Sequence, residues 1–219
     1  MPNSSETRTT TQWNYFFSAG SSSLAAHILL EEAGAIYRAT EVSIPKGEHR
    51  SAEFLGRNPK GRIPALQTPD GMLTENPAIL EYIAAKHPKA GLLPTGAFAQ
   101  AQARSLAAYL CSTVHVAFAH FKRGNRWAKE DSAIREMKKH AAANLRDCAT
   151  FLENDLPLSP WALAHGYSFC DPYLFLLGGW LRTTGATMKD MPKLSAHQKA
   201  MQARPATQRV LALHDGRSG

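Results

Sequence analysis

The sequence predicts a small α/β domain followed by an all-helical domain. Two observations support this prediction. Up to about residue 87, segments that alternate like strands are interleaved with segments that repeat apolar residues at helical spacing. From about residue 97 onward the strand patterns vanish and only amphipathic helical stretches remain. We place a linker over residues 88–96, within the Pro- and Gly-rich run HPKAGLLPTGA.

The first domain, residues 14–87, has the predicted element order βαβαββα. The aromatic run NYFF is a short strand, and the run SSLAAHILLEEAGA that follows is a helix ended by Gly34. YRATEVSI alternates as a second strand, and SAEFLGRNP is a helical turn broken by its Asn-Pro pair. IPALQT and GMLT are strands joined by a PDG turn. NPAILEYIAAKHP is a helix with Asn76 at its N-cap and a proline directly after it.

The second domain, residues 97–219, consists of helical stretches. The first, AQAQARSLAAYLCSTVHVAFAHF, carries an apolar face at a spacing of four: Leu106, Leu110, Val114 and Phe118. DSAIREMKKHAAANLRDCATFLENDL is a second helix. SFCDPYLFLLGGWLRTTG is nearly apolar throughout and is therefore expected to be the buried central helix. MPKLSAHQKAMQARPATQRVLALH closes the bundle.

Composition narrows the class of protein. The first twelve residues, MPNSSETRTTTQ, are polar, and residues 1–13 are expected to be a disordered extension, not a signal peptide. No apolar run reaches the ~18 residues of a membrane span. The net charge of +7 comes from scattered basic residues, so we expect a solvated surface and no nucleic-acid partner. Cys111, Cys148 and Cys170 lie far apart and are expected to be buried, reduced thiols of a cytoplasmic protein. No His or Cys cluster has metal-ligand spacing, so no metal is expected.

The stretch NPKGRIPAL contains a proline within a predicted strand. Pro64 has no backbone N–H and holds Ile63 extended, which restricts this strand to a sheet edge. The backbone N–H and C=O of Ile63 would then face outward and could pair with an extended peptide. An ordinary edge strand preceded by a turn explains the same residues.

Glu75 and Asn76, in LTENPAIL, stand at the start of a predicted helix. A helix N-terminus carries unpaired N–H groups and a partial positive charge that suit a carboxylate, while Glu75 can pair with an ammonium group. Together they suit the head group of an α-amino acid, which presents both charges side by side. The alternative is a solvent-facing glutamate beside a routine helix cap.

Ser168 and Asp171, in SFCDP, have the spacing of a capping box with Asp in place of the usual Glu. This motif marks where the central helix begins and stabilises it by ~1 kcal/mol per cap. We assign it no catalytic role.

Three consecutive serines, Ser21, Ser22 and Ser23, lie where the first strand leads into the first helix. Ligands bind at this end of α/β sheets. Either the serines only cap the helix, or one hydroxyl donates to an anion that the helix dipole also stabilises. If the anion is a thiolate, the pKa of the thiol falls towards neutrality.

In this order and at these separations, the motifs resemble the glutathione S-transferase family, most closely its bacterial beta-class members. The resemblance covers roughly Asn14 to His214, including GSSSLAAHILLEEAGA, NPKGRIPAL, LTENPAILEYIA, SFCDPYLF and AHQKAMQARPATQRVL. It implies a thioredoxin-like first domain with a cis-proline at Pro64, a helical second domain and a homodimer. It also implies a glutathione transferase, with glutathione as co-substrate and a small hydrophobic electrophile as the second substrate.

Carried over residue by residue, the resemblance implies a glutathione site in the first domain. The backbone of Ile63, beside Pro64, would bind the cysteinyl part. Glu75 and Asn76 would bind the γ-glutamyl head. Lys46, in IPKGEHR, matches the basic residue after the second strand that reaches glutathione.

A histidine on the first long helix of the second domain also matches the family. His115, in YLCSTVH, is its counterpart. Ala108, Ser112, His115 and Ala119 form a small, polar stripe that would turn His115 towards the cleft between the domains. A purely structural histidine is the alternative.

The chain departs from the beta-class pattern at Ser22, where those members carry a cysteine that can form a mixed disulfide with glutathione. Ser22 cannot form that bond, but its hydroxyl can donate to a glutathione thiolate, as Ser or Tyr does in other classes. Ser21 or Ser18 could do the same if the loop is shifted. Ala108 also replaces an Asn that contacts the partner subunit's glutathione.

These departures leave several activities open. Besides a transferase, the chain could be a non-catalytic binding or regulatory protein, or a glutathione-dependent peroxidase, etherase or isomerase. The residues expected to line the electrophile pocket are generic and apolar: Val114, Phe118, Trp127 and Trp180.

Overall fold

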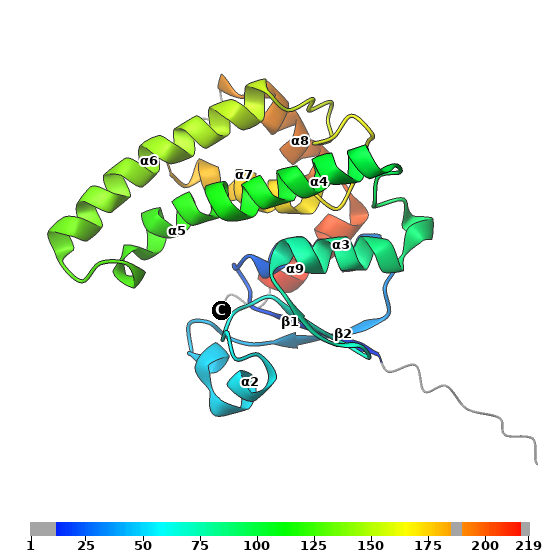
Figure 1. The fold of residues 1–219 in the computed structure, drawn as a ribbon, viewed down its shortest axis with the longest axis horizontal. Coiled ribbons are helices and arrows are strands. Elements are labelled where there is room, and N and C mark those ends of the chain that lie inside the picture. Colours follow the sequence, from blue (N-terminus) through cyan, green and yellow to red (C-terminus); the bar gives the residue numbers. More distant parts are fainter. Residues whose placement is uncertain (1–11, 185–189, 216–219) are drawn as a thin grey trace, which may run out of the picture.

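The computed structural model describes residues 12–184 and 190–215 (Figure 1). Its first part has the predicted order βαβαββα. The elements are β1 (Trp13–Phe17), α1 (Ser23–Glu32), β2 (Tyr37–Glu41), the 3-10 turn η1 (Glu48–Arg50), α2 (Ala52–Arg57), β3 (Ala65–Thr68), β4 (Gly71–Thr74) and α3 (Asn76–Lys86). The predicted α/β class of this part is confirmed.

The sheet has the strand order β2-β1-β3-β4, with β1 parallel to β2 and the other pairs antiparallel. The expectation that the strand after Pro64 lies at an edge is therefore wrong, because β3 pairs on both sides. Its ladder begins only at Ala65, so the missing N–H of Pro64 removes no rung. The Ile63–Pro64 peptide bond is cis.

Both faces of the sheet are covered. Figure 1 shows α3 and α9 between the sheet and the helical part, with α2 on the opposite side. Along β1, Tyr15 and Phe17 join the main core shared with the helices, whereas Phe16 packs with Phe54 of α2. All three aromatic rings are buried because consecutive strand residues point to opposite, covered faces.

The helical part begins after the linker. Its elements are the turn η2 (Pro88–Ala90), α4 (Ala97–Tyr109), the π-helical segment η3 (Leu110–Val114), α5 (His115–Arg123), the 3-10 turn η4 (Gly124–Arg126), α6 (Asp131–Asn154), α7 (Asp171–Arg182), α8 (Pro192–Gln202) and α9 (Pro205–Asp215). The predicted apolar face of α4, η3 and α5 is buried, and so is most of α7, the predicted central helix.

The C-terminal stretch only partly closes the bundle. It forms two helices, and the second, α9, packs against α1 of the first domain. Val210 contributes to a small core with Ile28 and Phe175, and His214 Nε2 lies 3.0 Å from His27 Nδ1. The end of the chain thus joins the two parts.

The predicted extension over residues 1–13 is too long. Residues 1–11 lie outside the described residues, but Trp13 is the first residue of β1 and pairs with Tyr37. Its ring packs against Tyr82 at 5.5 Å and edge-on against His87 at 5.3 Å, measured between ring centroids. These aromatic contacts hold the start of β1 in place. The polar residues that precede Trp13 gave no sign that the strand begins there.

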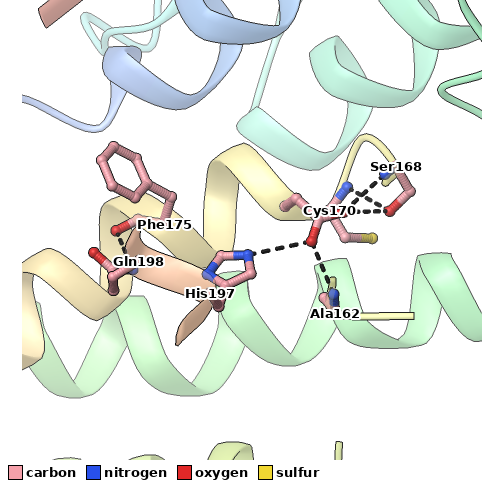
Figure 2. Close-up of polar contacts among 7 residues, drawn as sticks. Ala162, Ser168, Cys170, Phe175, His197 and Gln198 are labelled. Atoms are coloured by element: carbon pink, nitrogen blue, oxygen red, sulfur yellow. Dashed lines mark hydrogen bonds and ion pairs between the residues drawn. The ribbon is translucent and has the colours of Figure 1, made fainter. Parts of the chain in front are cut away.

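The carboxylate of Asp171 organises the start of α7. Figure 2 shows the groups that surround it, from Ala162, Ser168 and His197. Its Oδ2 accepts the backbone N–H of Ser168 at 2.7 Å, as the capping box predicts, and also the Ser168 hydroxyl at 3.1 Å. The other bond of a capping box is replaced, because the Asp171 N–H donates to the Ser168 carbonyl and not to its hydroxyl. Its Oδ1 accepts the Ala162 N–H at 2.8 Å and lies 3.2 Å from Nε2 of the fully buried His197 on α8. The local cap therefore also joins a loop and a second helix.

The cysteines are free in the structure, with Cys148 and Cys170 buried and Cys111 partly exposed. Within the described residues, no group of three or more His, Cys, Asp or Glu side chains could hold a metal ion. No described helix is both long and apolar enough to cross a membrane.

Candidate functional site

A cavity of about 560 Å³ lies between the sheet domain and helices η3 to η4. The sheet domain contributes Ser22, Ile44, Gly61, Ile63, Pro64 and Asn76. The helical wall contributes Cys111, His115, Val116, Ala119 and Trp127. Charged or titratable groups complete the lining: His49, Lys60, Arg62, Glu75, Arg123 and Arg126. The structure thus brings together Ser22, Ile63, Pro64, Glu75, Asn76 and His115 from the residues predicted by sequence.

Ser22 is the serine that reaches this cavity. It occupies the N-cap position of α1 but forms no side-chain capping bond, and it is 8% exposed. Its hydroxyl donates to the carbonyl oxygen of Ile63 at 3.4 Å, which is long for such a bond. The hydroxyl is thus only weakly engaged, at a helix N-terminus whose dipole favours an anion.

The neighbouring serines have structural roles. The Ser21 hydroxyl donates to the Ser18 carbonyl at 2.8 Å and accepts the Ser23 N–H at 3.2 Å. The Ser18 hydroxyl accepts the Ile44 N–H at 3.2 Å. The structure therefore does not bring Ser21 or Ser18 to the cavity, because both side chains hold the loop before α1.

The predicted N-cap of α3 is displaced by one residue. Asn76 is the first helical residue, and the cap position belongs to Glu75, whose φ of 72° is the only positive value among the described non-glycine residues. The buried Asn76 side chain donates to the Ser22 carbonyl at 2.9 Å instead of capping its own helix. This bond holds the N-termini of α1 and α3 beside the same cavity. The strained backbone at Glu75 is typical of functional sites.

A lysine that was not among the predicted site residues, Lys60, lies beside Glu75. The Lys60 ammonium lies 2.8 Å from the Glu75 carboxylate and 2.9 Å from the Thr74 hydroxyl. Lys46 is exposed and does not line the cavity. Because β3 and β4 pair Ala65 with Thr74, the loop before Pro64 comes beside Glu75. Lys60 lies within the motif NPKGRIPAL, and this position could have marked it in the sequence.

His115 lies on the helical wall, with Nδ1 3.0 Å from the Tyr173 hydroxyl. Burial, and secondarily the charge of Arg123, lowers the pKa of His115 to about 4, although Glu75 acts in the opposite direction. Burial likewise raises the pKa of the Cys111 thiol. Both groups are therefore neutral at pH 7.

The predicted polar stripe is only partly correct. His115 and Ala119 line the cavity, whereas Ala108 and Ser112 are exposed elsewhere. The π-helical segment η3 alters the turn between them, so a regular α-helical spacing does not carry across it. Cys111 takes the place in the wall that was expected for Ser112.

The expected electrophile pocket also needs correction. Of the apolar residues predicted to line it, only Trp127 does so. Val114 and Phe118 belong to the main core, and Trp180 stacks on Phe118 with ring centroids 4.4 Å apart. Their helical spacing predicted a shared buried face. In the structure that face packs into the interior of the helical part and does not line the cavity.

Three arginines contribute to the lining of the cavity. Arg62 precedes Ile63, and Arg123 and Arg126 follow one another at the end of α5 and in η4. Burial and the neighbouring positive charges lower the pKa of Arg123 and Arg126. In residues 12–184 and 190–215, none of the three forms an ion pair with a carboxylate.

The depressed pKa of His115 predicts a pH-dependent stability. The folded protein resists protonating this group, so its contribution is present above the unfolded pKa of about 6.5 and is lost as pH falls towards 4. Between pH 7 and 5 this loss should reach about 2 kcal/mol. Denaturant unfolding of His115→Gln should therefore lose about 2 kcal/mol less than wild type over that interval. Equal losses in the two proteins would show that His115 titrates normally.

Similar proteins are found along most of the chain. A family model described as glutathione S-transferase, N-terminal domain, matches residues 11–85. A glutathione transferase homologue from Sulfitobacter, crystallised with bound glutathione, is 40% identical, with a TM-score of 0.86 over 91% of this chain and 96% of that one. A bacterial beta-class glutathione S-transferase from Sphingomonas chungbukensis is 32% identical, with a TM-score of 0.80 over 92% and 98% of the two chains. Glutathione S-transferase 4 of Zea mays is 30% identical over 84% of this chain and 85% of its own.

Proposed function

The chain belongs to the glutathione S-transferase family and is a glutathione transferase, and from this premise we propose that glutathione binds in the cavity with its sulfur at Ser22. The observation that carries this proposal is the convergence of two helix N-termini, α1 and α3, on one cavity beside Ile63. The bound glutathione of the Sulfitobacter homologue supports it.

In the proposed complex, the cysteinyl backbone pairs with Ile63. Within the described part of the chain, the Ile63 carbonyl accepts one side-chain bond, the long one from Ser22, so a peptide N–H can replace that donor. The α-carboxylate of the γ-glutamyl head lies at the N-terminus of α3, next to Asn76. Its ammonium group pairs with the Glu75 carboxylate, which now contacts Lys60.

The proposed chemistry begins with ionisation of the thiol. The Ser22 hydroxyl, released from Ile63, donates to the sulfur, and the N-terminus of α1 adds its dipole; both lower the thiol pKa. The proton passes to water. His115, with a pKa of about 4, is too weak a base to retain that proton and acts as a neutral hydrogen-bonding group of the wall.

The thiolate then attacks an electrophilic carbon held near Val116, Ala119 and Trp127. A sulfur–carbon bond forms, and the leaving group departs with its electron pair. Pre-positioning both reactants supplies much of the rate. We propose a homodimer as the working form, an arrangement supported by the exposed ring of Phe151 beside Tyr109.

Changing Glu75 to Gln tests the binding mode. The affinity for glutathione should fall about 10- to 100-fold, because the charge-assisted contact with the ammonium is lost. Titration calorimetry of both proteins measures this effect. Glutaryl-cysteinylglycine, which lacks that ammonium, is the matched control and should bind wild type and Glu75→Gln about equally.

Two further results would contradict the assignment. One is an equal loss of affinity for glutathione and for glutaryl-cysteinylglycine, which would mean that Glu75 acts on the fold and not on the ammonium. The other is the absence of any binding heat with glutathione in wild type, together with no conjugation of 1-chloro-2,4-dinitrobenzene.

A further inference from the structure

The cavity carries more positive charge than glutathione can match. Lys60 already faces Glu75, which leaves the guanidinium groups of Arg62, Arg123 and Arg126. In the proposed complex the γ-glutamyl charges and the thiolate lie at α3 and α1. Only the glycyl carboxylate then remains, as one anion for three guanidinium groups.

The positions of the arginines divide them between two walls. Arg62 belongs to the sheet domain, directly before Ile63, where the tripeptide is proposed to lie. Arg123 and Arg126 belong to the helical wall, beside Val116, Ala119 and Trp127. The anionic group that these two arginines could hold would therefore lie beside the apolar surface for the second substrate.

A purely structural role does not explain the position of Arg123 and Arg126 in the cavity lining. Arg123 ends α5, where a cation interacts favourably with the helix dipole. Such a cation needs only to be exposed, whereas Arg123 is partly buried near Arg62 and Arg126. Arg62 and Arg126 are exposed, but their positive charges still act on the partly buried Arg123 guanidinium, which costs free energy unless an anion binds between them.

We propose that the second substrate is an organic carboxylate, whose carboxylate is held by Arg123 and Arg126 while Trp127 and Val116 cover its apolar part. Guanidinium groups bind planar carboxylates through paired, charge-assisted hydrogen bonds. This inference rests on the proposed function and narrows it, from a hydrophobic electrophile to an amphipathic, anionic one.

The test compares two probes that differ in one charge. 4-Chloro-3-nitrobenzoate and 4-chloro-3-nitrobenzamide both lose chloride to the glutathione thiolate. After correction for their uncatalysed rates, wild type should prefer the benzoate in kcat/KM by about 10- to 100-fold. Arg123→Gln and Arg126→Gln should each lose most of that preference, while KM for glutathione changes less than about twofold. Lys122→Gln, which removes the same charge from α5 outside the cavity lining, should keep the preference.

Binding provides a readout without turnover. With S-methylglutathione present, 4-nitrobenzoate should bind wild type more tightly than 4-nitrobenzamide, and Arg126→Gln should remove the difference. No preference for the benzoate in wild type by either measurement overturns the inference. So does a higher KM for glutathione with the benzoate preference intact, because both arginines would then hold the glycyl carboxylate. Failure of the proposed function is distinct, since it abolishes the binding heat of glutathione itself.

Discussion

Replacing Asp171 by alanine should lower the free energy of unfolding by about 3–5 kcal/mol. The carboxylate is fully buried and accepts the N–H groups of Ala162 and Ser168, at 2.8 and 2.7 Å, with His197 at 3.2 Å. Removing it leaves these donors without a partner inside the protein, and each unsatisfied buried donor costs about 1–3 kcal/mol. The loss is large because the donors belong to the loop before α7 and to the separate helix α8.

Denaturant unfolding monitored by circular dichroism measures this loss. Ser168→Ala is the matched control: it removes one hydroxyl bond to the same carboxylate and should cost only about 1 kcal/mol. Folded Asp171→Ala should bind glutathione with wild-type affinity, since Asp171 does not line the cavity. A loss no greater than that of Ser168→Ala would mean that the Ala162 and His197 contacts add nothing.

Replacing Ser22 by alanine should raise the pKa of the bound glutathione thiol by about one to two pH units. A hydrogen bond to a charged group contributes about 1.5–3 kcal/mol, and this bond stabilises the thiolate but not the thiol. Below the new pKa, conjugation should therefore slow by about 10- to 100-fold. Titration of the thiolate by its ultraviolet absorbance, in the saturated complex, measures the pKa directly.

Ser21→Ala is the control for this assignment. It removes the bonds to Ser18 and Ser23, and should lower stability by about 1 kcal/mol while leaving the thiol pKa unchanged. Ser22→Thr, which keeps a hydroxyl, should stay close to wild type. If the pKa moves in Ser21→Ala and not in Ser22→Ala, the hydroxyl at the sulfur is the wrong one.

Local patterns explain why much of the fold could be predicted. The aromatic run in β1, the apolar face from Leu106 to Phe118 and the capping box at Ser168 each depend on residues a few positions apart. Such signals survive into the structure because every face they describe is buried. The prediction was wrong where the local sequence did not fix the position of a residue in space. Trp13 was assigned to the extension, whereas its ring packs on Tyr82 of α3.

The candidate site was predicted in part for the same reason. Helix starts are readable, so the three serines before α1, together with Glu75 and Asn76, were predicted from the chain, and the family resemblance then favoured Ser22 among the serines. Lys60 was missed because its approach to Glu75 depends on the pairing of β3 with β4. Cys111 was assigned to the interior, since nothing in the sequence marks the π-helical segment that turns it to the cavity wall.

By itself, the sequence determined the order of the elements, the two domain classes and the helix N-termini suited to an anion, because these follow from spacing and from backbone chemistry within one turn. Only the tertiary structure decided which serine reaches the cavity, which lysine meets Glu75 and where the arginines gather. Those outcomes depend on contacts between residues far apart in the chain, such as Ser22 with Asn76. No local pattern encodes the relative position of two helices, since that position is set by how their buried faces pack together.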